Sequence, residues 1–172
     1  MFAPHMLTKK IKMIFEVDND IHVPSLNEPL QWNMRQRNTG QSLPSLLLGD
    51  EQRFKQVLIN LIKNSLKFTT YGSITITTGF KNGRITVYVR DTGYGIDQHA
   101  LMKLSRKFSK PELSAKLSHD GFGLGLTIVK KIVELGEGNV SVHSQGIGHG
   151  SLFTFDMKME ELQVLTIQSD DE

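Results

Sequence analysis

The sequence contains no cysteine among its 172 residues, which excludes a disulfide framework and any zinc site built from thiolates. It also has little excess charge, because 20 Lys and Arg against 18 Asp and Glu give a formal net charge of +2. A chain that binds nucleic acid as its main partner usually carries a dense basic stripe, so we expect no nucleic-acid partner. No apolar run reaches the roughly 20 residues that a membrane-spanning helix needs, and the first residues lack the basic-then-apolar order of a signal peptide.

The first half of the chain predicts a strand, a helix and a hairpin. Residues 10–17 alternate apolar and polar side chains, which indicates a strand. From Asp50 the period becomes helical, and Asp50 is a suitable N-cap for a helix that we expect to end near Phe68. Two further alternating segments, 73–80 and 84–90, are joined by Lys81, Asn82 and Gly83, a typical tight turn.

The second half predicts two more helices and two closing strands, with a polar, basic and mobile loop between the helices. In chain order these are a short helix at 96–104, the loop at 105–123, a helix at 124–135, and strands within 138–145 and 150–159. We expect one α+β domain over residues 1–172, with a core at about 7–159 and an acidic tail or linker at 160–172. It should be a two-layer α/β sandwich, in which a mixed, mostly antiparallel sheet of about five strands is covered on one face by about three helices.

One side of the predicted helix at 51–68 carries a polar stripe. At about 100° per residue, five side chains fall together on it: Arg53, Gln56, Asn60, Asn64 and Lys67. Taken alone, such a stripe is more typical of a solvent-facing surface. The alternative is the polar wall of a pocket, because Mg²⁺ accepts an Asn carbonyl oxygen and a lysine one turn further on can meet phosphate groups.

Three glycine-rich stretches follow. In "DTGYGI" (91–96), Asp91 ends a predicted strand, where its carboxylate can accept from an exocyclic amine such as that of adenine. In "GFGLGL" (121–126), alternating glycines precede a helix, whose free N–H groups make an anion site. "GIGHGSLFTF" (146–155) alone is typical of a turn before a strand. Taken alone, the first stretch is equally compatible with a capped turn, and the second with a flexible hinge. Neither the dinucleotide fingerprint nor a Walker loop is present.

In this order and at these separations, "NLIKNSLKFT", "DTGYGI", "GFGLGL" and "GHGSLFTF" resemble the N, G1, G2 and G3 boxes of histidine kinase catalytic domains. Those domains belong to the GHKL ATPase superfamily of the Bergerat fold, which also contains gyrase B, Hsp90 and MutL. The resemblance covers about residues 7–159. The gyrase branch typically carries a glutamate where Asn60 stands, so the pattern favours the histidine kinase branch.

The resemblance implies a site for ATP and Mg²⁺. It implies that Asn64 is the metal ligand, that Asn60 lies beside the triphosphate, and that Lys67 contacts phosphate, which makes these three the catalytic candidates. It also implies that Asp91 recognises the adenine amine. The other ATP-binding candidates are Gly93, Gly95 and Ile96 at the base, Phe108 and Lys110 in a lid, Gly121, Phe122, Gly123, Leu124, Gly125 and Leu126 around the phosphates, and Ser151 in the adenine network.

The lid departs from the family pattern. Such domains carry a mobile ATP lid between the G1 and G2 boxes, often with an arginine shortly before the G2 glycines. Leu117 stands at that position here, next to Lys116. A basic residue can still reach the γ-phosphate from Lys110 or Lys116, so the departure leaves the lid's catalytic role open and nucleotide binding unaffected.

The function implied by the resemblance is that of the catalytic domain of a two-component or phosphorelay histidine kinase. It would donate the γ-phosphate of ATP to a histidine on a separate dimerisation domain that we expect outside this chain, with a receiver domain as a further partner. We expect the isolated domain to be monomeric, cytoplasmic and incomplete as an enzyme. The alternatives are a non-catalytic module that senses ATP and docks to a partner, and a clamp-type ATPase, against which Asn60 argues because it replaces a water-activating glutamate.

Overall fold

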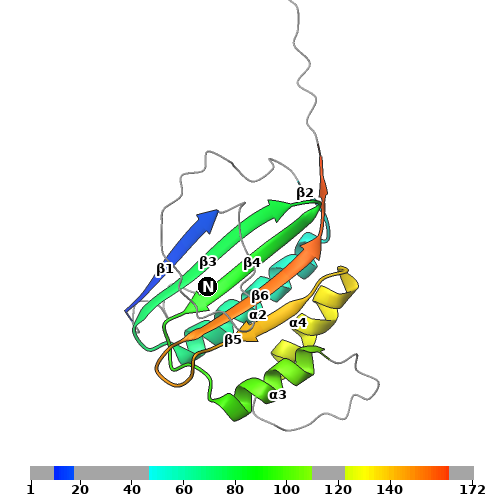
Figure 1. Cartoon of the computed structure of the whole chain (residues 1–172). Coiled ribbons are helices and arrows are strands. Elements are labelled where there is room, and N and C mark those ends of the chain that lie inside the picture. The colour runs from blue at the N-terminus through cyan, green and yellow to red at the C-terminus, as the bar shows by residue number, and fades with distance from the viewer. Residues whose placement is uncertain (1–9, 18–46, 110–122, 163–172) are drawn as a thin grey trace, which may run out of the picture.

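The computed structural model describes residues 10–17, 47–109 and 123–162, and it has two layers (Figure 1). One layer is a five-stranded sheet in the order β1-β3-β4-β6-β5. The described elements are β1 (Ile11–Val17), β2 (Leu47–Leu48), α2 (Glu51–Phe68), β3 (Gly72–Lys81), β4 (Arg84–Asp91), α3 (Gln98–Ser109), α4 (Gly123–Leu135), β5 (Val140–His143), β6 (Ser151–Lys158) and β7 (Glu160–Glu161). The predicted α+β fold, with a mixed sheet and helices on one face, is confirmed.

The sheet is mostly antiparallel. β1 pairs with β3 in parallel, whereas the β3–β4, β4–β6 and β5–β6 pairs are antiparallel. α2 runs behind the sheet in Figure 1, and α4 packs against α2. The apolar face of the sheet and the apolar sides of the helices form one core, which includes Leu61 of α2, Val87 of β4, Val129 of α4 and Phe155 of β6, all fully buried.

Helix α2 begins as the sequence predicts. Asp50 has an extended backbone, and its carboxylate accepts a hydrogen bond from the backbone N–H of Arg53 at 2.9 Å. The helix ends at Phe68, where the N–H of Thr69 still bonds to the carbonyl of Ser65 at 2.9 Å. At the start of the helix, the Asp50 carboxylate thus supplies an acceptor for one of the N–H groups that have no partner within the helix.

The hairpin between β3 and β4 has a tighter turn than expected. Lys81 pairs with Arg84, so Lys81 belongs to β3 and the loop contains only Asn82 and Gly83. Both loop residues have positive φ, 52° and 72°. This is the geometry that matches the twist of two antiparallel strands, and Asn-Gly is the sequence that adopts it at least cost.

The prediction of a mobile loop beginning at residue 105 is wrong for its first part. Helix α3 continues to Ser109, so residues 105–109 are helical. The reason is apolar spacing: Leu104 is buried, and Leu101 and Phe108 pack against the core beside it. These three positions lie on one side of a helix. Residues 110–122 of the predicted loop lie outside the described part of the chain.

A second sheet ties the end of β6 to the start of α2. Leu47 and Leu48 pair in antiparallel fashion with Glu161 and Glu160, so the first two residues of the predicted acidic tail form a strand. The backbone N–H of Met159 bonds to the carbonyl of Gly83 at 2.9 Å, which continues the chain's attachment past β6. Within the described residues, no helix is both long enough and apolar enough to cross a membrane.

Replacing Asp50 with Ala should destabilise the fold by about 1 kcal/mol, because an N–H at the start of α2 loses its acceptor. The matched control is Glu51→Ala, which removes an exposed acid that pairs with Lys55 one turn along and should cost less than half as much. Urea unfolding of both variants measures the difference. Equal losses would show that the cap contributes no more than a surface ion pair.

Candidate functional site

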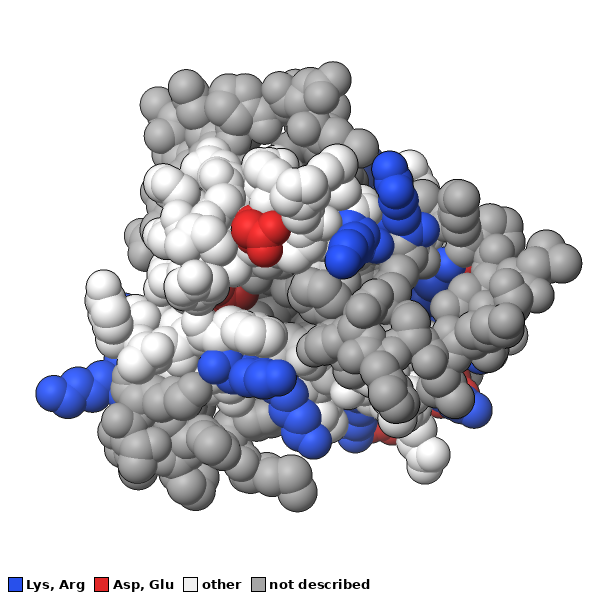
Figure 2. Space-filling model, turned by 90° about the horizontal axis from the view of Figure 1, so that it is seen from below, with Lys and Arg blue, Asp and Glu red and all other residues white. Residues whose placement is uncertain are grey.

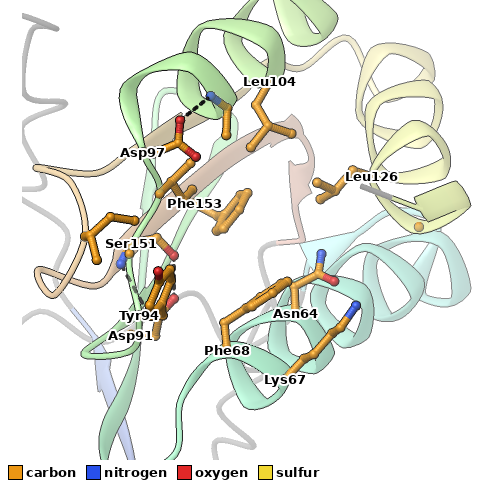
Figure 3. A pocket seen from close by; sticks show the side chains of 15 residues that line it. Asn64, Lys67, Phe68, Asp91, Tyr94, Asp97, Leu104, Leu126, Ser151 and Phe153 are labelled. Carbon is orange, nitrogen blue, oxygen red and sulfur yellow. Dashed lines mark hydrogen bonds between the residues drawn. The ribbon is translucent and has the colours of Figure 1, made fainter. Parts of the chain in front are cut away.

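A pocket with a volume of about 270 Å³ opens between α2, the segment after β4, α3, the first turn of α4 and the start of β6. Figure 3 shows its side chains converging from these elements. Eight residues that the sequence predicts as site residues line it: Asn64, Lys67, Asp91, Gly95, Ile96, Gly125, Leu126 and Ser151. The fold therefore brings together parts of all four sequence boxes, which are far apart in the chain.

Asp91 is the most constrained polar residue of the pocket. It is the last residue of β4, and only 3% of its surface is exposed. One carboxylate oxygen, Oδ1, accepts from the backbone N–H of Gly93 at 2.9 Å and of Ser151 at 3.2 Å. The other, Oδ2, accepts from the hydroxyl of Ser151 and from the hydroxyl of Ser65 at 3.3 Å. A buried carboxylate needs such donors, because burial without hydrogen bonds strongly disfavours its charge.

The segment after Asp91 is bonded to two neighbouring elements. The N–H of Tyr94 donates to the carbonyl of Phe68 at 2.9 Å, which joins the segment to the end of α2. The N–H of Gly150 donates to the carbonyl of Gly93 at 3.1 Å, and that of Gly148 to the carbonyl of Tyr94 at 2.7 Å. These bonds hold the turn before β6 directly against the segment that follows Asp91.

Ser144, which the sequence reading missed, completes this connection. It is buried, and its hydroxyl donates to the carbonyl of Gly150 at 2.7 Å while accepting from the N–H of Ile96 at 3.0 Å. Gly95, which precedes Ile96, has a φ of 79°, and a Cβ there would come within 2.1 Å of the carbonyl oxygen of Gly146. The two glycine-rich turns can approach this closely only because Gly95 has no side chain.

The opposite wall comes from α2. Asn64 is half-buried, and Figure 3 shows its amide and the Lys67 ammonium across the pocket from Asp91 and Ser151. The Nζ of Lys67 lies 5.1 Å from the centre of the Phe68 ring. Asn60 does not line the pocket; its Nδ2 donates to the carbonyl of Gln56 at 2.9 Å. Its Oδ1 would be 3.2 Å from a Cβ on Gly125, so the first turn of α4 packs closely against this side of α2.

Seven lining residues were not predicted, and most are apolar: Phe68, Tyr94, Asp97, Ala100, Leu104, Ile147 and Phe153. Phe153 carried a usable signal, because it lies two residues after Ser151 in a strand and must share its face. Leu104 required knowledge of where α3 packs, which periodicity alone does not provide. Asp97 caps α3, since it accepts from the N–H groups of His99 and Ala100 at 2.9 and 3.0 Å.

The remaining predicted residues lie elsewhere. Gly93 does not line the pocket, and a Cβ on it would come within 2.4 Å of the Phe68 carbonyl oxygen. Leu124 is 66% exposed, and Phe108 packs against the core from α3 without lining the pocket. Gly123 is the first residue of α4. Lys110, Gly121 and Phe122 lie outside the described residues.

The charged residues that line the pocket are of both signs, Asp91 and Asp97 together with Lys67. Seen from below, lysine and arginine side chains stand on both sides of a hollow in the surface (Figure 2). Across residues 10–17, 47–109 and 123–162, no cluster of three or more His, Cys, Asp or Glu side chains is placed to hold a metal ion.

The model of the histidine kinase-, DNA gyrase B- and HSP90-like ATPase family matches residues 49–161, a segment that contains every element lining the pocket. The chain belongs to this family. Hybrid signal transduction histidine kinase L of Dictyostelium discoideum is 42% identical over 125 residues, which are 69% of this chain and 7% of that protein. Signal transduction histidine-protein kinase BarA of Escherichia coli is 35% identical over 128 residues, 72% of this chain and 14% of that protein.

Among solved structures, full-length ShkA in complex with AMPPNP resembles this ATPase-family domain with a TM-score of 0.66 and 26% identity. The likeness covers 95% of this chain and 28% of that one. The chain thus spans a small part of the length of the kinases that it matches. What is common to all of them is the ATPase domain of histidine kinases.

Gly95→Ala should destabilise this domain more than Gly148→Ala does. Both glycines have a left-handed φ, 79° and 84°, so both variants incur a backbone strain of about 1–3 kcal/mol. Only the Cβ at Gly95 also collides with a carbonyl, whereas nothing lies within 4 Å of one at Gly148. Thermal unfolding of the two variants compares them, and an equal loss would mean that the close contact between the turns is not required.

Proposed function

We propose that this domain binds Mg-ATP and donates the γ-phosphate to a histidine on a separate dimerisation domain. The observation that carries the proposal is the pocket's two-ended chemistry. A buried carboxylate, Asp91, lies at one end, and an amide and an ammonium from α2, Asn64 and Lys67, lie at the other. Apolar side chains separate them, which suits a flat base flanked by a polar amine and a charged tail.

The base end supports recognition of an amine. Leu104 and Phe153 are buried and line the same pocket as Asp91 and Ser151, so a planar ring that enters it exchanges water for apolar contacts. A ring amine next to the Asp91 carboxylate donates a charge-assisted hydrogen bond, which is roughly twice as strong as a neutral one. A ring carbonyl at the same place would meet the carboxylate with lone pairs facing lone pairs. The pocket therefore favours a base that presents an amine to this carboxylate, as adenine does.

The phosphate end supports binding of a polyanion. The first turn of α4 contributes Gly125 and Leu126 to the lining, and the N–H groups of a helix's first turn have no partner within the helix. Together with the helix dipole they attract phosphate oxygens. Lys67 adds a point charge from α2, and its position over the Phe68 ring keeps the ammonium at the rim of the pocket.

The donor set around Asn64 fits Mg²⁺. This cation prefers hard oxygen ligands and keeps several waters, taking few ligands from the protein and the rest from phosphates. Asn64 supplies one amide oxygen at the pocket wall. When bound, Mg²⁺ would neutralise charge that develops on the phosphate oxygens during transfer. The described residues need only hold the triphosphate in line for attack.

The proposed nucleophile is a histidine of another domain. Of the described histidines, His99, His143 and His149, none lines the pocket. Catalysis would then depend on positioning and on electrostatic stabilisation of the transferred group. The isolated domain is expected to bind ATP and to hydrolyse it slowly, with the histidine-bearing domain and a receiver domain as its partners in the parent protein.

Calorimetric titration with ATP tests the binding step. Wild-type chain should bind ATP more tightly with Mg²⁺ than without it, and Asp91→Asn should weaken binding by about 10-fold or more, because an amide cannot accept from all of these donors. Asn64→Ala should retain binding without Mg²⁺ and lose the gain that the metal provides. The matched control is Asp156→Asn, whose carboxylate pairs with Arg84 outside the pocket. No binding by folded wild-type chain at millimolar ATP would overturn the proposal.

The transfer step separates the kinase from a non-catalytic ATP sensor, which the leucine at position 117 favours. We expect the chain, mixed with the histidine-bearing domain of its parent protein and Mg-ATP, to form acid-labile phosphohistidine on that domain. Asn64→Ala should lower the rate by about 100-fold or more, since the metal is worth several kcal/mol to the transition state. Tight ATP binding with no phosphohistidine would instead establish the sensor.

A further inference from the structure

Ser65 lies between Asn64 and Lys67 in the sequence of α2, yet it does not line the pocket. By helical period it belongs to the apolar side of α2, and it is 1% exposed. Its hydroxyl donates to Oδ2 of Asp91 at 3.3 Å. A serine at a core position is thus turned toward the carboxylate at the base end of the pocket.

The other donors to Asp91 come from different parts of the fold. Gly93 belongs to the segment that follows β4, and Ser151 begins β6. Among the described residues, Ser65 is the donor that α2 supplies to this carboxylate. The same helix carries Asn64 and Lys67 into the pocket. The Ser65 hydroxyl therefore links the element that holds the phosphate end to the group that faces the base.

We infer that Ser65 is a positioning residue, which holds the Asp91 carboxylate in the orientation that an adenine amine requires. This inference rests on the proposed ATP-binding function. Ser65 acts through Asp91, since it is enclosed by protein and has no access to the ligand. It sets where Oδ2 lies relative to the phosphate-binding side chains of α2.

The hydrogen bonds at Asp91 explain why this second hydroxyl matters. A carboxylate offers about four acceptor sites, and the four donors from Gly93, Ser151 and Ser65 already fill them. An incoming amine must take the place of one donor. Ser151 lines the pocket and is half-buried, so its hydroxyl has room to turn aside. The enclosed Ser65 hydroxyl keeps its hydrogen bond to Oδ2, so the carboxylate does not rotate when the Ser151 hydroxyl turns away.

The test compares Ser65→Ala with wild type for two nucleotides, ATP and purine riboside triphosphate, which lacks the amine. We expect affinity for ATP to fall by about 3- to 10-fold, the range for one net hydrogen bond. Affinity for purine riboside triphosphate should change by less than about twofold, because no amine then depends on the orientation of Asp91. Ser65→Ala removes a single oxygen, so the core keeps its shape.

A matched control removes a similar hydroxyl elsewhere. Thr77 is buried in β3, and its hydroxyl donates to the Glu16 carboxylate at 3.1 Å outside the pocket. Thr77→Val should lower stability in urea and leave both nucleotide affinities unchanged. A double variant with Asp91→Asn completes a thermodynamic cycle, in which Ser65→Ala should cause no further loss of ATP affinity.

The outcomes separate the inference from the function on which it rests. If wild-type chain binds ATP but Ser65→Ala weakens both nucleotides equally, or neither, or tightens ATP, Ser65 is a structural residue and the inference is overturned. A further loss in the Asp91→Asn background also overturns it. If folded wild-type chain binds neither nucleotide, the proposed function itself fails.

Discussion

The structure depends on one buried negative charge. Asp91 lies where α2, β4 and β6 meet, and its carboxylate accepts hydrogen bonds from Gly93, Ser151 and Ser65. A carboxylate in this position is tolerated only when its oxygens are fully hydrogen-bonded. The three elements must therefore hold fixed positions relative to one another, and these positions shape the pocket that they line.

The glycines around the pocket follow from the same constraint. A Cβ on Gly150 would come within 2.0 Å of the Asp91 carbonyl oxygen, and one on Gly93 within 2.9 Å of its carboxylate. Chains can pack this closely around a buried acid only where no side chain intervenes. Gly125 has a different task, because it brings the first turn of α4 close to Asn60. Glycine thus allows close packing of the turns around Asp91 and of helix α4 against α2.

Sequence patterns predicted the parts of this fold that local physics decides. Asp50 and the Asn82-Gly83 turn act through neighbours in the chain, so their roles could be read directly. The β2–β7 pair could not, because two residues a side are too short to show a period. The extra turns of α3 depend on Phe108 packing against a core that only the tertiary structure forms.

The site shows the same division. The boxes predicted which residues gather, and eight of them line one pocket. Asn60 and Phe108 stay predictions as site residues, because neither lines the ligand-free pocket: helical period gives a direction around the axis but not the neighbour that lies there. Ser65 fell on the apolar side by the same period, and its role emerged only when β4 placed Asp91 opposite it. Contacts between segments 26 residues apart leave no trace in periodicity.

The donors that hold Asp91 are all neutral, and this decides what the pocket can recognise. Backbone amides and serine hydroxyls stabilise the carboxylate without cancelling its charge, whereas a lysine or arginine paired with it would compete with any ligand amine. Within the described residues, no ion pair reaches Asp91. Under the proposed function, this charge is available to an amine of the ligand. Because Lys67 lines the same pocket from α2, the proposed complex would have the acid at one end of the nucleotide and the lysine at the other.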